Sequence, residues 1–568
     1  MGHVIHGLDP KGVLFTMITD FKINDNRKAE YYRKGYWDGD TLNDVWNRIV
    51  SQFGDCEYVS DDRNQRFTYA QVDDKASRLA AWFKEQGIES GDVISWQVPI
   101  WADFAYVYVA ALKVGAVMHP LPRNFNEEDL SYVMNTVGTK LFLCPTFYWK
   151  TDYEQQTVNF MDRVPTLKAV ALLDKDAPIK HTDRFPSVQH ILDTYEPLTE
   201  PPTSKSDEVV CILSTSGTTG RPKQVLMTHN NLKFSERVYT KLALRTQADV
   251  MIMMSPLNHA TGFYHGLLSN MMMGARVVLQ EHFDADHAVE LINREGVTWS
   301  HGATPFVYDL LNYMEGSGKE CPSLDIFISG GAPVPQSMVR RCWKHLFLLC
   351  ESYGSTESCP HIFVPPHNAL EWDGKWSGIP YEGIEVRFVD AEHKPVHQGD
   401  QGEECSRGPH QFVGYLNNPE ANAKCLDDDG WFYSGDLGYM DEEGRVRING
   451  RMKEIIIRGG ENISAVEIDN DLEGCPGIVD HATVGMPDAR LGERICTFVV
   501  PTDPAHCPTV ADVQKFLGSK NIQKRNWPER IEAIDAIPYT MSGKVKRYIL
   551  AQEVKERLKE EANEKRFI

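Results

Sequence analysis

The sequence predicts an α/β protein with a large, multi-part body of layered α/β sheets over residues 1–450 and a small α+β domain over residues 451–568. Three observations support this fold class. The 568 residues exceed the size of one compact domain. Strand and helix patterns alternate through the first third of the chain, which is typical of parallel sheets covered by helices. Beyond Gly450-Arg451 the charges become dense and the elements short, as in a small separate domain.

The first clear helix is predicted between Thr68 and Gly87. Thr68 and Gln71 have the spacing of a capping box, in which each side chain bonds the other residue's backbone N–H. Apolar residues then recur on one helical face, and Gly87 ends the helix. These apolar residues are Val72, Ala76, Leu79, Ala80 and Phe83.

Short apolar runs predict the strands that follow. They are Val93–Val98, Val117-Met118, Leu141–Cys144 and Ala169–Leu173, with a second apolar helix that ends near Gly115. A polar, proline-bearing connector at Leu198–Asp207 leads into a further strand, Val209–Leu213.

The longest uncharged stretch is Val250–Ala275, which Pro256, Asn258 and His259 interrupt. We expect buried strands with a functional loop between them, rather than a membrane span. Near the C-terminus, the charged segment Glu553–Lys565 predicts a helix on the surface, in contact with solvent.

The charge balance limits the partners of this chain. Its 59 Lys and Arg residues against 80 Asp and Glu give a formal net charge of −21, which argues against a nucleic-acid scaffold or a polybasic membrane binder. The N-terminus, Met1–His6, has neither the basic nor the apolar region of a signal peptide. The 12 cysteines form no CxxC pair, so we expect free thiols in a reducing cytoplasm and no structural zinc site.

The strongest chemical motif is Thr-Ser-Gly-Thr-Thr-Gly-Arg-Pro-Lys at 215–223, directly after an apolar strand. Glycines let several backbone N–H groups converge, and hydroxyls with a lysine add donors for phosphate oxygens. The spacing differs from that of a Walker loop, and no Rossmann fingerprint is present. A flexible surface loop is the alternative interpretation, which the apolar strand before the motif disfavours.

Five further strings follow in order: Ser-Tyr-Gly-Ser-Thr-Glu at 352–357, Tyr-Ser-Gly-Asp at 433–436, Gly-Arg-Met-Lys-Glu at 450–454, Gly-Gly-Glu-Asn-Ile at 459–463 and Ser-Gly-Lys at 542–544. With them the chain resembles the adenylate-forming superfamily of acyl-CoA synthetases, aryl and aminoacyl adenylating enzymes and beetle luciferases. The resemblance covers nearly the whole chain. It implies that the small C-terminal domain is a mobile lid.

The resemblance assigns the nucleotide site residue by residue. Thr215, Ser216, Gly217, Thr218, Thr219, Gly220 and Lys223 would hold the β- and γ-phosphates of ATP. Tyr353 would stack on adenine, beside the backbone of Gly331 and Ala332. Thr356 would bind the α-phosphate, and Glu357 would help to hold Mg²⁺. Asp436 and Arg451 would bind the ribose hydroxyls.

Lys544 is the implied catalytic lysine, which would offset negative charge while a carboxylate attacks the α-phosphorus. Lys453 occupies the hinge position, about which the lid swings between adenylate-forming and thioester-forming states. His259 would gate the passage from the acid site to the pantetheine tunnel of coenzyme A, and Gly459 with Gly460 would line the other end. An exposed lysine and a satisfied core histidine are the structural alternatives for Lys544 and His259.

Two positions depart from the family's pattern. Gln224 stands after the phosphate loop, where glycine is common. The segment Gln523–Pro528 keeps only part of a basic motif, which leaves the contacts of the CoA nucleotide phosphates unassigned.

The resemblance implies that residues 259–266, 303–305, 330–332 and 353–355 line the acid site. None of them offers an Asp for an amino-acid ammonium group, so we expect an apolar acid that is alicyclic, aromatic or of medium or long chain. The string Tyr-Arg-Lys-Gly-Tyr-Trp at 32–37 is similar to aryl-acid AMP ligases and alicyclic-acid CoA ligases.

We therefore expect an AMP-forming acid:CoA ligase that uses ATP, Mg²⁺ and coenzyme A. One alternative is an adenylating enzyme that loads a carrier-protein thiol or, like the luciferases, oxidises the adenylate. A nucleotide-binding sensor without turnover is another, although every polar group that the reaction needs is present in the sequence. The expected partners are a small carboxylic acid and CoA, with no nucleic acid, and a homodimer is left open.

Overall fold

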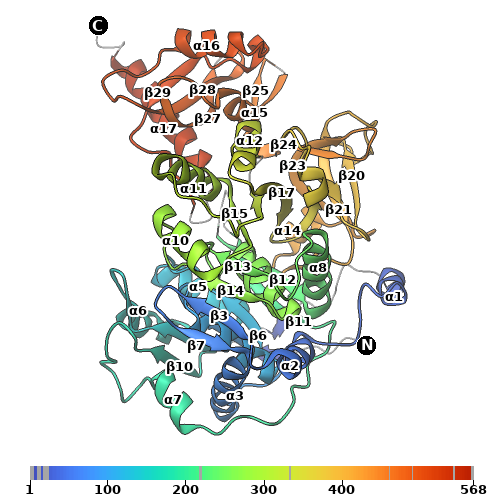
Figure 1. Cartoon of the computed structure of the whole chain (residues 1–568), viewed down its shortest axis with the longest axis vertical. Coiled ribbons are helices and arrows are strands. Elements are labelled where there is room, and N and C mark those ends of the chain that lie inside the picture. The colour runs from blue at the N-terminus through green and yellow to red at the C-terminus, as the bar shows by residue number, and fades with distance from the viewer. Residues whose placement is uncertain are drawn as a thin grey trace.

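The computed structural model describes residues 6–8, 14–16, 25–215, 221–331, 334–459, 461–488, 490–540 and 544–564. Two large sheets and the helices on their faces make up the body, and the C-terminal elements form a separate layer above it (Figure 1). This arrangement confirms the predicted α/β class, with a large body of layered sheets and a smaller α+β part at the C-terminal end.

The first sheet holds the strands predicted from the first third of the chain. Its order is β10-β7-β5-β6-β11-β12-β22. The bounds are Ala169–Leu173, Thr139–Pro145, Val93–Trp96, Val117–Pro120, Val209–Thr215, Lys223–Thr228 and Gly414–Tyr415. Strand β5 ends two residues earlier than predicted, ahead of Pro99, which has no N–H to continue a ladder.

Two helices that cover this sheet also match the prediction. Helix α3, Tyr69–Glu85, begins with the capping box of Thr68 and Gln71. Helix α4, Asp103–Val114, ends at Gly115, whose φ of +73° is one that glycine adopts without strain. The two helices pack against each other.

The second sheet positions the site described below. Its order is β19-β18-β17-β16-β15-β13-β14-β3-β4, and the strands from β3 to β17 in this order are parallel. The bounds are Ile379–Pro380, Cys359–Phe363, Leu348–Ser355, Ile326–Gly330, Trp299–Ala303, Val250–Met253, Arg276–Leu279, Glu57–Asp61 and Arg66–Thr68. The carboxyl ends of parallel strands are where ligands bind in such sheets.

The uncharged stretch 250–275 differs from the expectation of strands on both sides of a loop. After β13 the chain turns at His259 and enters a π-helix, η2, Thr261–Leu268, followed by α9, Ser269–Met273. Gly262 allows this return, because a Cβ atom there would lie 2.3 Å from the carbonyl oxygen of Pro256. No helix among the described residues has the length and apolar character to cross a membrane.

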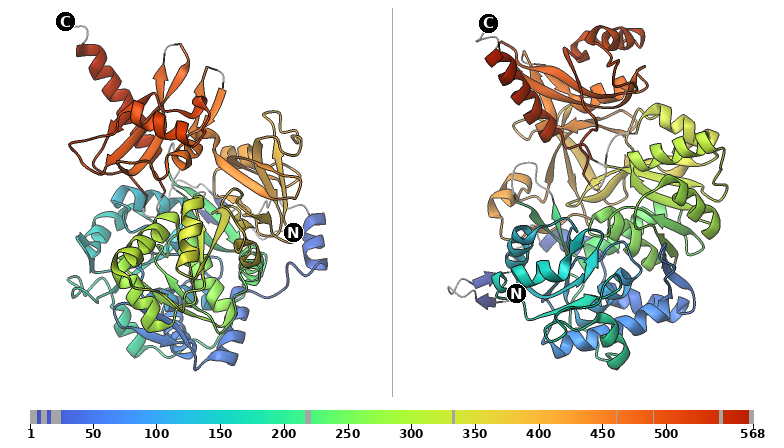
Figure 2. Two further views of the ribbon diagram at one scale, coloured as in Figure 1. Left: turned by 45° about the horizontal axis from the view of Figure 1, so that its top comes forward. Right: turned by 90° about the vertical axis from the view of Figure 1, so that its left-hand side faces the viewer.

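The C-terminal part has its own sheet and its own apolar core (Figures 1 and 2). The sheet order is β26-β25-β28-β27, with β29 beside β28. The bounds are Glu461–Ser464, Ile455–Arg458, Gly492–Pro501, Ile478–Asp488 and Arg530–Ala533. The sheet before it, β20-β21-β23-β24, spans Glu385–Val389, Gly402–Arg407, Phe432–Met440 and Val446–Arg451.

The last helix, α17, corrects the prediction of a fully solvated surface element. It runs over Arg547–Glu564 and therefore begins six residues before the predicted start at Glu553. Leu550 and Val554 are fully buried against strand β27. Two apolar residues one helical turn apart are enough to bury one face of an otherwise charged helix.

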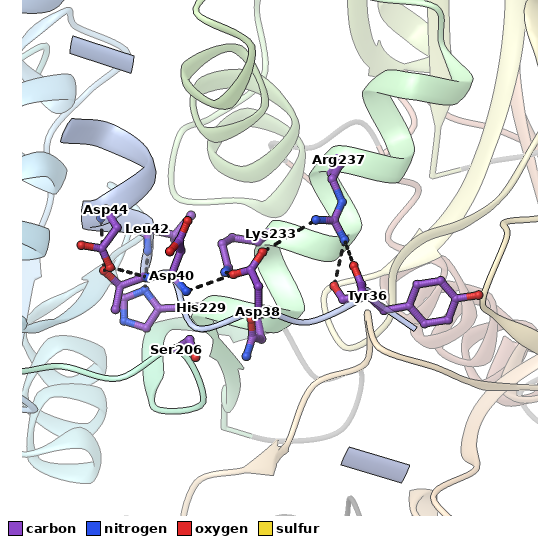
Figure 3. Close-up of polar contacts among 12 residues, drawn as sticks. Tyr36, Asp38, Asp40, Leu42, Asp44, Ser206, His229, Lys233 and Arg237 are labelled. Carbon is purple, nitrogen blue, oxygen red and sulfur yellow. Dashed lines mark hydrogen bonds and ion pairs between the residues drawn. The ribbon is translucent and has the colours of Figure 1, made fainter. Parts of the chain in front are cut away.

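An N-terminal arm, residues 34–41, joins α1 (Asp25–Arg33) to α2 (Leu42–Phe53) and lies along α8, His229–Leu242 (Figure 3). Lys233 forms an ion pair with Asp38. Arg237 Nη2 donates to the carbonyl oxygens of Gly35, at 3.1 Å, and Tyr36, at 2.9 Å. These contacts fix the arm to the helix.

We expect substitution of Lys233 and substitution of Asp38, the two residues of the arm's ion pair, to change the free energy of unfolding by different amounts. Lys233 is 5% exposed, whereas Asp38 is 48% exposed. Asp38→Ala leaves a buried cation without its partner and should lower the free energy of unfolding by about 1–3 kcal/mol. Lys233→Met leaves a carboxylate that water can reach and should cost less than about 1 kcal/mol. Urea unfolding of both variants measures the difference, and equal losses would show that the pair has no such asymmetry.

Four buried histidines are neutral in the folded state, so acid should destabilise the protein through them. Burial lowers the pKa of His119 and His229 to about 3 and holds the pKa of His301 and His410 well below the usual value. Below about pH 6.5 these histidines bind protons in the unfolded chain but stay neutral in the folded one. The free energy of unfolding therefore decreases as the pH is lowered, by up to about 1.4 kcal/mol per pH unit for each histidine.

His119 offers a direct test of this pH dependence, because glutamine can replace its contacts with Ser95 and Gln224. His119→Gln should give a stability profile that is shallower than the wild-type profile by about half a proton at pH 6.5 and by nearly one proton at pH 5.5. Parallel profiles, measured by urea unfolding at each pH, would contradict the assignment of a neutral His119.

Candidate active site

The phosphate-loop motif spans the gap between two paired strands. Thr215 ends β11, Lys223 begins β12, and the two residues face each other in the antiparallel register. Thr215 Oγ1 donates to the Lys223 carbonyl oxygen at 3.4 Å. The other predicted members, Ser216, Gly217, Thr218, Thr219 and Gly220, lie outside the described residues.

Gln224, the departure from the family's pattern, is buried directly after this loop. Its Oε1 accepts hydrogen bonds from Ser214 Oγ, at 2.9 Å, and from His119 Nε2, at 3.2 Å. The glutamine thus connects the start of β12 to the carboxyl ends of β6 and β11.

Lys223 and Glu357 lie close together and share a neighbour, Tyr415. The Lys223 Nζ atom lies 3.9 Å from the centroid of the Tyr415 ring, and the Tyr415 hydroxyl donates to Glu357 Oε1 at 2.7 Å. Burial lowers the pKa of Lys223, and the negative charge of Glu357 opposes this shift. Glu357 is buried in the turn between β17 and β18, and Thr356 is half-buried beside it. Tyr415 was not predicted, because a tyrosine on a two-residue strand carries no chemical pattern.

Tyr353, Asp436 and Arg451 form a second group. Asp436 and Arg451 are paired across β23 and β24, with Arg451 Nε 3.1 Å from Asp436 Oδ1. The Tyr353 hydroxyl donates to Asp436 Oδ2 at 2.7 Å. Burial raises the pKa of Asp436, while the guanidinium of Arg451 and the Tyr353 hydrogen bond act in the opposite direction. This group offers carboxylate oxygens and a flat ring at one place.

Lys544 comes from the C-terminal part and lies against the body. A Cβ atom at Gly331, which directly follows β16, would be 3.2 Å from Lys544 Cε. Burial lowers the pKa of Lys544, and the nearby Arg451 lowers it further, whereas Asp436 and Glu357 raise it. The structure therefore brings Lys544 to the two groups described above. Ala332, the neighbour of Gly331, lies outside the described residues.

His259 lies near enough to Lys544 for the charge of the lysine to act on its ring. Its Nδ1 atom accepts a hydrogen bond from the Thr261 backbone N–H at 3.3 Å, so the proton of the neutral ring is on Nε2. Burial, together with the positive charge of Lys544, lowers the pKa of His259 to about 3. The ring is therefore neutral near pH 7.

The two remaining predicted positions lie in the C-terminal part. Lys453 is exposed in a single 3-10 turn, Met452–Glu454, between β24 and β25, and its charge lowers the pKa of Lys223. Gly459 follows β25 with a φ of +61°, and its N–H donates to the Leu491 carbonyl oxygen at 2.7 Å. The structure places Gly459 against this C-terminal neighbour rather than beside Lys544. Gly460 lies outside the described residues.

Over most of its length the chain is similar to known enzymes. The family model of the AMP-binding enzyme matches residues 46–416, and that of the AMP-binding enzyme C-terminal domain matches residues 467–544. The medium-chain fatty-acid–CoA ligase of Escherichia coli (strain K12) is 39% identical over 541 residues, which cover 95% of each chain. The 2,3-dihydroxybenzoate-AMP ligase of Bacillus subtilis (strain 168) is 28% identical over 95% of this chain and 99% of its own.

The crystal structure of ATP-bound MatB from Rhodopseudomonas palustris superposes with a TM-score of 0.80 at 26% identity, covering 91% of this chain and 99% of that one. These likenesses confirm the resemblance to adenylate-forming enzymes and the predicted reaction class, an AMP-forming acid–CoA ligase. The chain belongs to the AMP-binding enzyme family.

Proposed function

We propose that this ligase activates an apolar carboxylic acid of medium size, in two steps that share one site. The juxtaposition of Lys544 with the group of Asp436, Arg451 and Tyr353 is the observation that carries the proposal. The 39% identity to a medium-chain fatty-acid–CoA ligase supports an acid of that length. Alicyclic and aromatic acids of similar size belong to the same proposed class.

In the first step, a carboxylate oxygen of the acid attacks the α-phosphorus of ATP, and the bond to pyrophosphate breaks. Negative charge gathers on the oxygens around the phosphorus, where a cation lowers the barrier most. Lys544 would supply that cation, and Thr356 would bind the α-phosphate. Thr215 and Lys223 would hold the β- and γ-phosphates, together with the undescribed loop residues 216–220. Tyr353, beside Gly331, would stack on adenine, with Asp436 and Arg451 on the ribose.

The residues present fit a Mg²⁺ ion that ATP brings with it. Mg²⁺ usually takes one or two protein carboxylates together with phosphate oxygens and water. Among the described residues no group of three or more His, Cys, Asp or Glu side chains could hold a metal ion by itself. Glu357, with one oxygen bonded to Tyr415, would supply the single carboxylate. The ion would neutralise phosphate charge while the residues above position the nucleotide.

In the second step, the thiol of CoA attacks the carbonyl carbon of the acyl-adenylate, AMP leaves and the thiol proton passes to solvent. We place the boundary between body and lid at Gly450/Arg451, so that residues 451–568 form the lid, and we place the hinge at Lys453, so that the residues after 453 rotate between the steps. The separate sheet and apolar core of the C-terminal part support this division. Rotation would bring Gly459 and Gly460 to the pantetheine tunnel and open the gate at His259.

All 12 cysteines lie among the described residues and are free, which supports a reducing compartment, and we propose the cytoplasm. A carrier-protein thiol is the alternative acceptor. The mass of the particle in solution distinguishes a monomer from a homodimer.

A pyrophosphate-release screen over carboxylic acids, with and without CoA, tests the proposal. We expect release that depends on a medium-chain acid, and acyl-CoA as the product when CoA is present. Release that needs no acid, or no release with any acid, would contradict the ligase. Acid-dependent release without acyl-CoA would favour the carrier-protein acceptor.

A further inference from the structure

A buried polar cluster lies beneath the reactive site, between α8, η2 and β15. It consists of Glu236 and Tyr239 on α8, His265 on η2 and His301 on β15. His265 Nδ1 lies 3.1 Å from both carboxylate oxygens of Glu236. The His265 ring stacks on the His301 ring, with centroids 5.2 Å apart and an angle of 18° between the planes. Most polar groups this deep in a protein have a hydrogen-bond partner, so a buried group without one needs an explanation.

His301 is held as one tautomer. Its Nδ1 atom is 2.7 Å from the Tyr239 hydroxyl, and burial keeps the ring neutral by holding its pKa well below the usual value. If Nδ1 carried the proton, the Tyr239 hydroxyl hydrogen would be buried with no other acceptor among the described residues. The hydroxyl therefore donates to Nδ1, and the ring proton is on Nε2.

The Nε2 atom of His301 lies beside Gly330, one of the residues that the family resemblance assigns to the acid site. A Cβ atom at Gly330 would lie 3.2 Å from His301 Nε2, just as one at Gly331 would lie 3.2 Å from Lys544 Cε. His301 is 3% exposed, and its Nε2 has no hydrogen-bond partner in the part of the chain that the structure describes. The electrostatic influence of His259 and His265 on the pKa of His301 places all three rings near one another.

We propose that His301 determines acid specificity by donating its Nε2–H to an oxygen atom on the acyl chain. The preferred substrate is then an apolar acid that carries one oxo, hydroxy or ether oxygen, rather than the plain alkanoate of the same length. This inference rests on the proposed function and names the substrate class of the same site. Glu236, through His265, and Tyr239 are positioning residues that hold the ring.

The reason is the asymmetry between a hydrogen bond made and one left unmade in a dry pocket. A plain alkyl chain over Gly330 would cover the Nε2–H and leave it without an acceptor, which typically costs more than the bond itself contributes. A site that hydrogen-bonds its substrate therefore strongly rejects an analogue that lacks the hydrogen-bonding group. An apolar site discriminates much less against an analogue that carries an additional polar group. An acid with its oxygen at the right carbon should be favoured about 10- to 100-fold.

The first experiment compares octanoate with the positional series of oxo- and hydroxyoctanoates in the pyrophosphate-release assay. We expect at least one oxygenated isomer to exceed octanoate in kcat/KM by about tenfold or more. Release with octanoate that equals or exceeds release with every oxygenated isomer overturns the inference, and leaves the ligase intact. No release with any acid contradicts the proposed function instead, so the two failures are distinguishable.

Variants at position 301 test whether the ring is responsible. His301→Leu should remove the preference for the oxygenated acid, because it deletes the donor and keeps an apolar volume. His301→Gln keeps an N–H donor and should retain part of the preference, which a purely structural role would not predict. Tyr239→Phe removes the hydroxyl that keeps the ring proton on Nε2, so the His301 ring can adopt either tautomer. This variant should lower the preference for the oxygenated acid without abolishing it. An unchanged ratio of kcat/KM values in His301→Leu, or in a folded His301→Gln if the leucine variant is unstable, overturns the inference.

Discussion

Lys544→Ala should lower the rate of adenylate formation by about 10²- to 10³-fold, the size of effect seen when one electrostatic donor is removed from a transition state. The lysine lies against Gly331 and is close enough to Asp436 and Glu357 for their charges to raise its pKa. In the proposed function this is where a carboxylate and the α-phosphate of ATP would meet. Single-turnover release of pyrophosphate measures this step directly.

The second half-reaction separates this role from a general defect. Conversion of supplied acyl-adenylate to acyl-CoA should stay near the wild-type rate, because thiol attack on a preformed adenylate needs no cation at the α-phosphorus. Lys546→Ala is the matched control, since this lysine is two residues away, is also half-buried and shows no contact of its side chain with the site among the described residues. A Lys544→Ala variant that adenylates normally would remove the residue from the mechanism, and equal failure at both steps would indicate a misfolded or undocked C-terminal part.

Local features of the fold could be predicted from the sequence because local rules determine them. The capping box at Thr68 and Gln71, the glycine after α4 and the strand Ala169–Leu173 all occur as predicted. The stretch after His259 could not be predicted, because its π-helix depends on a close approach between Gly262 and Pro256 that only the folded chain defines. The buried face of α17 was missed for the same reason. Two apolar residues among many charges form a core face only once β27 lies beneath them.

The candidate site also contains some residues that could be predicted from the sequence and others that could not. Motif residues such as Asp436, Arg451 and Lys544 could be proposed from the sequence, because their spacing and order resemble a known family. Tyr415 and His301 carry no such pattern. Tyr415 becomes significant when β22 pairs with β12 and its hydroxyl reaches Glu357, and His301 when α8 and η2 cover β15. A lone tyrosine or histidine acquires a role from its neighbours across the fold, and these cannot be derived from one sequence.

Lys453→Pro should leave adenylate formation close to the wild-type rate and lower thioester formation on the order of 10²-fold, the loss expected when a reacting group is misplaced. Lys453 lies in the 3-10 turn that joins β24 of the body to β25 of the C-terminal part. Residues in such a turn have a φ near the −65° that proline fixes, so the substitution should be tolerated in the present arrangement. In that arrangement Lys544 already lies in the site. A rotation about residue 453 would need a different φ, which proline forbids.

The comparison with Lys453→Ala isolates the backbone from the side chain. Alanine removes the ammonium group and its influence on Lys223 but keeps the rotation, so both half-reactions should stay near wild type. Retained adenylation by the proline variant serves as its own control for folding, because Lys544 must still reach the site. Equal losses in the two half-reactions would argue that residue 453 is not where the rotation occurs. A thioester step that proline leaves intact would show that CoA reacts with the adenylate without any rotation of the C-terminal part about this residue.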